Sequence, residues 1–290
     1  MSSYVLPLFV ITLAAATVNG ALGYGFSSIT VPLALLFLTN RALNPALVLI
    51  EVVLNAWVLW VNRGAFQQVW RRVLPIVIGL APGVVVGTII VSQVSPGWLK
   101  LATYVVLLPL ILVQAAGYRR PIQAERSAWL VFGGGVGLLY SVTTISGPPL
   151  AVMLNNQGFA KREFRAALGL VRLAESTFPA CAYFSAGLFT SASIGLIPQI
   201  LPGVAIGVPI GAFLIRRIRP ETFRRVCMSF DAWVVAFGVS TLLRDLHIVR
   251  SVAAYLVLGL VAAIDTWMLY RFFSADSAAA AASGLTQPTS

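Results

Sequence analysis

The feature that most constrains this chain is its series of long apolar runs. Seven of them lie near residues 43–61, 74–93, 98–117, 166–187, 192–215, 223–243 and 251–270, separated by short loops that carry Arg, Pro or Gly. A helix that crosses a bilayer needs about 20 mainly apolar residues, so each run is long enough to cross once. Only 10% of the residues are charged and 59% are hydrophobic, which leaves too little polar surface for a water-soluble protein. We therefore predict an all-α polytopic membrane protein.

Two further apolar stretches are interrupted by helix-breaking residues. Residues 4–38 are too long for one crossing, and residues 128–154 contain Gly and Pro near their middle. The first interruption holds Gly20, Gly23, Gly25, Ser27, Ser28, Thr30 and Pro32, and the second holds Thr143, Thr144, Ser146, Gly147, Pro148 and Pro149. Proline lacks an N–H and clashes with the preceding helical turn, whereas glycine permits a sharp bend. We expect two half-helices in each stretch.

The basic residues of the loops indicate how these stretches lie in the membrane. Single crossings would divide the loop Lys and Arg residues 8 against 11, whereas two hairpins divide them 15 against 4. The fifteen are Arg63, Arg71, Arg72, Arg119, Arg120, Arg126, Lys161, Arg162, Arg165, Arg216, Arg217, Arg219, Arg224, Arg225 and Arg271, and the four are Arg41, Lys100, Arg244 and Arg250. Cytoplasmic loops carry an excess of Lys and Arg, so the hairpins are favoured. This predicts a multi-pass protein of a bacterial-type inner membrane with its N-terminus outside and its C-terminus in the cytoplasm.

An internal repeat supports the same arrangement. Gly79, Gly83, Gly87 and Pro96 recur 124 residues later, with the same spacing, as Gly203, Gly207, Gly211 and Pro220. With one hairpin and three crossings in each repeat, the second copy must be inverted relative to the first. We place repeat one at about 4–117, repeat two at about 128–243 and an extra helix at about 251–270. All lie in one transmembrane domain, residues 1–273, before a disordered tail at 274–290. The glycines, four residues apart, are interpreted as helix-packing positions.

The hydroxyl residues at the two breaks are the predicted substrate site. Broken helices in inverted-repeat transporters expose backbone N–H groups near the midplane, where the positive ends of helix dipoles favour an anion. Side-chain donors are available from Ser27, Ser28 and Thr30 in the first break and from Thr143, Thr144 and Ser146 in the second. These groups add donors without permanent charge, which suits an oxyanion that must bind and then leave. The alternative is that small residues here only allow close helix packing.

Five charged residues fall inside the apolar spans, where charge is costly and usually functional. They are Glu51, Arg172, Glu175, Asp231 and Asp265. Arg172 and Glu175 are three residues apart and can pair on one helix face, and Glu51 occupies the corresponding span of repeat one. In one interpretation Arg172 attracts the anion and a carboxylate carries a proton; in the other the charges form a structural pair without a transport role. Asp231 and Asp265 are either proton sites or contacts to a partner helix.

Several function classes are disfavoured by what the sequence contains. Cys181 and Cys227 lie in apolar segments without a CxxC or Cys/His cluster, so we predict no metal site and no cofactor. No ATP-binding loop or nucleophile elbow occurs, so we expect a transporter and not an enzyme. The net charge of +11 resides in short loops, which favours anionic lipid over nucleic acid as its partner. The expected partners are a small anionic substrate and membrane lipid, with a homodimer as an open alternative.

Short motifs at both breaks resemble those of the TauE/SafE sulfite exporter-like family. The second break reads Ser146-Gly-Pro-Pro-Leu-Ala-Val-Met-Leu and is followed by Gly158-Phe-Ala-Lys-Arg-Glu-Phe-Arg-Ala-Ala-Leu, and the first reads Gly20-Ala-Leu-Gly-Tyr-Gly-Phe through Pro32-Leu. Tyr140-Ser-Val-Thr-Thr-Ile stands where the family often has several glycines. By motif position, the resemblance implies a substrate site at Ser27, Ser28, Thr30, Pro32, Ser146, Gly147, Pro148 and Pro149; Arg172 is added from its charge.

The resemblance implies a secondary carrier that exports sulfite or a small organosulfonate such as sulfoacetate. We expect it to work by alternating access, with the two hairpins forming the site and a proton gradient or the membrane potential driving transport. Two alternatives remain at this point. One is an anion channel or an importer on the same scaffold, and the other is a membrane enzyme or assembly factor whose buried charges bind a lipid or a partner protein.

Overall fold

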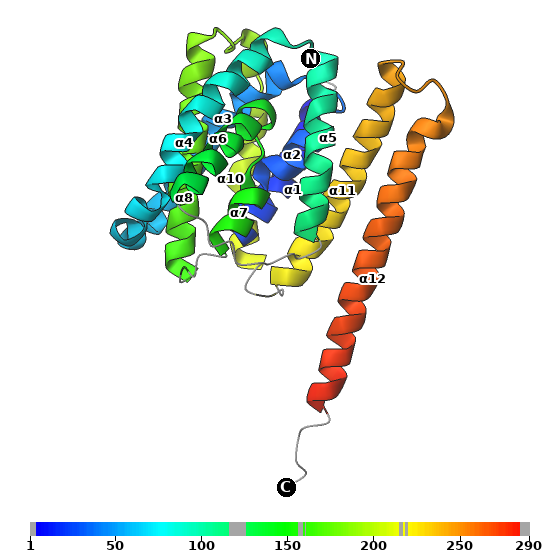
Figure 1. Ribbon diagram of the computed structural model, residues 1–290. Helices are drawn as coiled ribbons and strands as arrows, with labels where there is room; N and C mark the ends of the chain where they lie inside the picture. Colours follow the sequence, from blue (N-terminus) through cyan, green and yellow to red (C-terminus); the bar gives the residue numbers. More distant parts are fainter. Residues whose placement is uncertain are drawn as a thin grey trace.

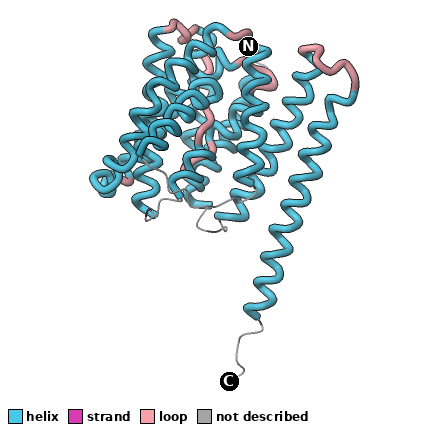
Figure 2. Tube along the Cα trace, viewed as in Figure 1, coloured by secondary structure: helices cyan, strands magenta, loops and turns pink. Residues whose placement is uncertain are grey.

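A computed structural model of the chain describes residues 4–115, 126–155, 159, 161–214, 217 and 220–284. Within these ranges every regular element is a helix, as Figures 1 and 2 show. The helices form an upright bundle, with one long helix, α12, extending past its lower end in Figure 1. The prediction of an all-α polytopic membrane protein is confirmed.

Both interrupted stretches form the expected pairs of half-helices. In the first stretch α1 (Val5–Leu22) and α2 (Phe26–Ala34) are separated by Gly23 and Gly25, whose φ angles are 83° and 103°. Glycine adopts such angles without a steric penalty, so these two positions allow the chain to turn back. In the second stretch α6 (Arg126–Thr143) and α7 (Gly147–Asn155) are separated by the short segment 144–146.

Within the described residues, seven longer helices make up the rest of the bundle. They are α3 (Asn40–Val61), α4 (Phe66–Gln93), α5 (Pro96–Ala115), α8 (Lys161–Ser185), α10 (Ile197–Leu214), α11 (Pro220–Asp245) and α12 (Leu256–Gly284). Short elements at Arg63–Ala65, Ser191–Ile194 (α9) and Val252–Tyr255 lead into α4, α10 and α12. Four ranges in the described residues are long and apolar enough to cross a membrane: Asn40–Val61, Arg63–Gln93, Ser191–Leu214 and Val252–Ser274. At 1.5 Å per residue, the 20 residues of α5 also reach about 30 Å.

The ends of the helices follow the predicted hairpin arrangement. In Figure 1 the N-terminus and the start of α3 lie at the upper end of the bundle, whereas α8 begins at the lower end and the C-terminus lies below it. At the upper end, the Ser193 hydroxyl beyond α8 donates a hydrogen bond to the Arg41 carbonyl at the start of α3 (3.3 Å). The start of α3 and the end of α8 are therefore at the same end of the bundle.

Each pair of half-helices packs mainly on a helix distant from it in the sequence. The most extensive helix contacts are α4 with α6 and α1 with α10. A Cβ atom built on Gly83 would overlap the Gly134 carbonyl oxygen of α6, and one on Gly211 would overlap the Thr17 carbonyl oxygen of α1. The absence of side chains at these positions lets the helix backbones touch, as expected for small residues in membrane helices. The glycine series thus has the packing role predicted for it.

Helices α3 and α8 run antiparallel against each other. Leu59, near the end of α3, contacts Gly169 in the first half of α8. Asn55, one turn earlier in α3, donates to the carbonyl of Arg172, which lies further along α8 (3.2 Å). These two contacts place the end of α3 beside the first half of α8.

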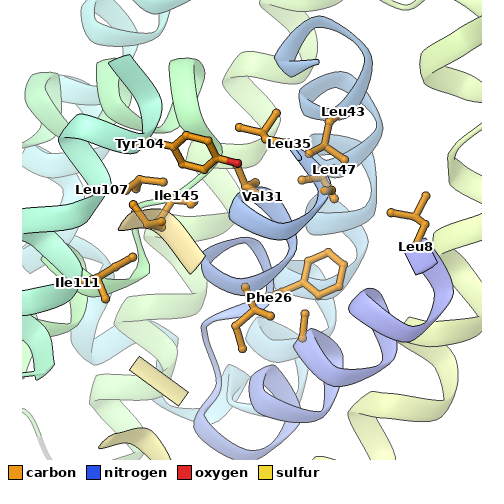
Figure 3. Close-up of a cluster of buried hydrophobic side chains, with 14 of the residues drawn as sticks. Leu8, Phe26, Val31, Leu35, Leu43, Leu47, Tyr104, Leu107, Ile111 and Ile145 are labelled. Carbon is orange, nitrogen blue, oxygen red and sulfur yellow. The ribbon is translucent and has the colours of Figure 1, made fainter. Parts of the chain in front are cut away.

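The first half-helix pair is held in the centre of the largest apolar cluster. Figure 3 shows Phe26 and Val31 of α2 among Leu43 and Leu47 of α3 and the α5 side chain of Tyr104. The Tyr104 hydroxyl donates to the Pro32 carbonyl (2.7 Å), a group near the end of α2 that lacks a helical partner. This hydrogen bond fixes the end of α2 against α5.

Two expectations about the C-terminal part were wrong. Arg225 was counted among the loop residues, but it lies in α11, is buried and pairs with Asp265 of α12 (3.5 Å). The tail was expected to be disordered from residue 274, whereas α12 continues to Gly284. The reason is its run of alanines, the residue with the highest helix propensity. Residues 285–290 lie outside the described residues.

Candidate functional site

The two helix breaks lie against each other inside the protein. A Cβ atom built on Gly147, at the start of α7, would be 3.4 Å from the side chain of Tyr24 in the first break. The hydroxyl residues predicted for the site are all buried: Ser27, Ser28, Thr30, Thr143, Thr144 and Ser146. The structure therefore brings together residues from both breaks that are more than 100 positions apart in the sequence.

Glu51 of α3 accepts three hydrogen bonds at the breaks. Its Oε1 accepts hydrogen bonds from the Ser27 hydroxyl and from Nη2 of Arg172, the latter at 3.2 Å. Its Oε2 accepts a hydrogen bond from the Tyr140 hydroxyl of α6 (2.6 Å). Glu51 is 1% exposed and Arg172 is 4% exposed, so the ion pair is shielded from solvent. Burial without this pairing would be costly for either charge.

Glu175 forms a second hydrogen bond to a break. Its Oε2 accepts from the Ser146 hydroxyl at 2.5 Å, while its Oε1 is buried without a hydrogen-bond partner. Nε of Arg172 and the hydroxyl of Thr30 are also buried without partners. Buried polar atoms nearly always have a partner, so these three atoms are available to a polar ligand.

The ion pair formed by Arg172 differs from the expected one. The spacing of Arg172 and Glu175 predicted a pair on one face of α8, but the guanidinium pairs with Glu51 across the α3–α8 interface. Glu175 instead turns to Ser146 in the second break. Both side chains leave the same face of α8, and that face is packed against α3 and α7, so partners on these neighbouring helices replace the one on α8 itself.

The backbone at the second break is strained. Thr144 has φ 55°, in the left-handed region that β-branched residues seldom adopt. Its N–H donates to the Tyr140 carbonyl at 2.5 Å, which closes the last turn of α6. The hydroxyl of Thr143 then accepts the N–H of Ile145 (3.0 Å) and so satisfies one donor of the segment before α7. The surrounding hydrogen bonds hold a conformation that this sequence would not adopt alone.

Tyr140 and Asn55 belong to the site but were not predicted as part of it. Tyr140 lies one turn before Thr144, so its proximity to the second break was available from the spacing. Asn55 lies one turn after Glu51 on α3, and its amide donates to the Arg172 carbonyl (3.2 Å) and to the Ser176 hydroxyl (3.4 Å). Because Asn55 follows Glu51 by one helical turn, the sequence spacing could have indicated that it belongs to the site.

The remaining predicted residues are placed as follows. The carbonyl of Pro32 accepts the Tyr104 hydroxyl of α5, Pro149 is half-buried, and the side chain of Pro148 lies outside the described residues. Asp265 accepts from the Ser229 hydroxyl (3.0 Å) and pairs with Arg225, away from the breaks. Asp231 is buried with both carboxylate oxygens unpartnered. Among the described residues, no group of three His, Cys, Asp or Glu side chains could hold a metal ion.

The buried guanidinium of Arg172, paired with Glu51, makes the breaks suitable for binding an anion reversibly. Arginine presents several N–H donors in one plane and can bind two oxygens of an oxyanion at once. The serine hydroxyls of both breaks now donate to Glu51 and Glu175, and the same donors can turn to an anion that takes a carboxylate's place. The geometry thus provides both the attracting charge and the groups that compete for it.

The sequence of the chain matches a known protein family and one of its named members. A family model described as sulfite exporter TauE/SafE matches residues 8–238. A protein of Cupriavidus necator named "Probable sulfite/organosulfonate exporter TauE" is 29% identical over 188 residues, which are 62% of this chain and 71% of that relative. No solved structure matches the chain.

Proposed function

The chain belongs to the sulfite exporter TauE/SafE family, and we propose that it exports sulfite or a small organosulfonate such as sulfoacetate from the cytoplasm by alternating access. The protein is a multi-pass membrane transporter by family and by its apolar helices. The name of its Cupriavidus necator relative supports a sulfur-containing anion as the substrate class. Its place in the inner membrane, with the N-terminus outside, is part of the same proposal.

The Arg172–Glu51 ion pair is the observation that supports the proposal most. Both charges are buried, and Glu51 accepts hydrogen bonds from Ser27 of the first break and from Tyr140, one turn before Thr144 in the second. The anion displaces the Glu51 carboxylate from the Arg172 guanidinium, and Ser27 and Ser146 turn from the glutamates to the anion. Release at the other face restores the pair. A carboxylate that competes for the guanidinium keeps binding weak enough for the anion to leave.

The driving force requires no ATP-binding domain. A potential that is negative inside moves an anion outward with about 2.3 kcal/mol per charge per 100 mV. Glu51 and Glu175 are the groups positioned to carry a proton, because each changes its partner when the anion binds. A pH gradient applied at zero membrane potential distinguishes transport coupled to protons from transport driven by the potential alone.

Sulfite flux in proteoliposomes tests this function. Saturable flux is expected for the wild type, a strong loss for Arg172→Ala and Ser146→Ala, and partial flux for Arg172→Lys, which keeps the charge but not the planar fork. Arg225→Ala is the matched control, because it removes another buried arginine that pairs with a carboxylate away from the breaks. Absence of wild-type flux in folded protein, or flux unaffected by Arg172→Ala, would contradict the proposal. Voltage-dependent single-channel currents would show instead that the protein is a channel and not a carrier.

A further inference from the structure

A pocket of about 210 Å³ lies between α1, α3, α8 and α10, outside the hydrogen-bonded cluster at the breaks. Its described lining includes Asn19 and Gly23 at the end of α1, Asn62 at the end of α3, and Arg165 near the start of α8. Arg165 is exposed, so the pocket reaches the surface, whereas Asn19 is buried. The pocket therefore extends from the end of the bundle to the first break.

The helix register aligns this pocket with the Arg172–Glu51 pair. Arg165, Leu168 and Arg172 follow one another at intervals of three and four residues, so they lie on one face of α8. At 1.5 Å per residue, Arg172 is about 10 Å deeper than Arg165. Leu54, which lines the pocket from α3, is one turn from Glu51. The lining residues Leu54 and Leu168 are thus each about one helical turn from the ion pair.

Arg165 is placed to attract an anion. It is the charged residue among the described residues that line the pocket, and it forms no ion pair within the described part of the chain. Arg63 and Arg71, at the same end of the bundle, instead lie over the rings of Trp60 and Trp70, at 4.4 and 5.2 Å from the ring centroids. A cation beside a low-dielectric cleft concentrates anions at its mouth.

From these observations we propose that the pocket is the cytoplasmic vestibule of the transporter and that Arg165 is the first cation met by the substrate. The inference rests on the proposed function and adds the route by which the anion reaches the breaks. The volume suits this role, since it is below the roughly 300–1,000 Å³ of sites for drug-sized ligands. Sulfite or a two-carbon sulfonate fits such a space, and the apolar Leu54 and Leu168 line it ahead of the ion pair.

Sided transport kinetics test the role of Arg165. For sulfite presented at the cytoplasmic face at low salt, Arg165→Glu is expected to raise KM at least tenfold with little change in kcat, and added salt should shrink the difference. KM at the opposite face should not change. Arg165→Lys should behave like the wild type, and Arg71→Glu is the control of equal charge change at the same end. Kinetics of Arg165→Glu that match those of Arg71→Glu would overturn the vestibule while leaving the exporter intact. Absence of saturable wild-type flux would overturn both.

A labelling experiment tests the route without measuring transport. Leu168→Cys, in a Cys181→Ser, Cys227→Ser background, should react faster with an anionic methanethiosulfonate than with a cationic one when these are applied from the cytoplasmic side. Sulfoacetate should protect the thiol; it is used because sulfite cleaves mixed disulfides. Adding Arg165→Glu should reverse the charge preference. Equal rates for both reagents and no protection would contradict a vestibule for anions.

Discussion

Glu51 and Glu175 are 124 residues apart, the spacing of the internal repeat, and each accepts a hydrogen bond from a serine at the break of its own repeat. Their surroundings differ, because Glu51 also binds Arg172 and Tyr140, whereas one oxygen of Glu175 has no partner. Arg172 thus pairs with Glu51 and not with Glu175. In the alternating-access proposal, this inequality distinguishes the state described here from its counterpart facing the other side.

Replacing Glu51 by Gln should make stability depend on the anion. The change leaves the Arg172 charge buried without its carboxylate, and breaking such a pair costs about 3–5 kcal/mol. We expect a lower Tm than the wild type without substrate and a larger rise of Tm when sulfite is added, because the anion replaces the lost charge. Differential scanning fluorimetry in detergent measures both.

Asp265→Asn is the control for that experiment. It breaks the Arg225–Asp265 pair between α11 and α12, so it should also lower the Tm. Sulfite should not restore the stability of this variant beyond its effect on the wild type. Equal rescue of the Glu51 and Asp265 variants would show that the anion does not bind at Arg172.

Thr144→Gly should be tolerated and should stabilise the second break. The φ of 55° costs a threonine about 1–2 kcal/mol relative to glycine, which is partly offset by the lost Thr144 hydroxyl contact to the Thr143 carbonyl (2.7 Å). A net gain of up to about 1 kcal/mol is expected in reversible unfolding by detergent titration. Thr143→Gly, one residue earlier and still helical, should instead lose stability, since it removes the cap of the Ile145 N–H. The same sign for both variants would argue against strain at residue 144.

Alanine at the packing glycines should separate helices that now touch. Gly83→Ala places a Cβ on the Gly134 carbonyl oxygen, so α4 and α6 must move apart, at a cost of about 1–3 kcal/mol. Gly135→Ala on α6 is the matched control, because a Cβ there meets nothing within 4 Å. The control should keep or slightly raise the Tm, since alanine favours the helix. A Gly83→Ala variant as stable as the control would contradict the contact.

Thiol accessibility tests the orientation of the repeats. In a background without Cys181 and Cys227, Ser191→Cys should react with a membrane-impermeant maleimide added outside whole cells. Gln67→Cys, also exposed, should react only after the membrane is opened or inverted. Labelling of residue 191 from the cytoplasmic side would contradict the inverted-repeat arrangement.

The elements of the fold were predictable because their causes are local. Gly23 and Gly25 predict the first break, and apolar runs of about 20 residues predict the membrane crossings. The contacts of Arg172 were not predictable in the same way. Sequence spacing identifies neighbours on one helix, so it favoured Glu175, whereas the partner Glu51 depends on how α3 and α8 pack across 121 positions. The vestibule was missed for the same reason, since four helices from both repeats line it.

The packing of α1 on α10 has a consequence for synthesis of the protein. Translation proceeds at roughly 5–20 residues per second, so the α10 glycines that pack against α1 are synthesised about 10 to 40 s after α1 itself. Until then, the face of α1 that α10 covers in the folded protein has no partner helix. The nascent first half therefore depends on the insertion machinery, or on the water at the membrane surface, to hold this hairpin until its partner arrives.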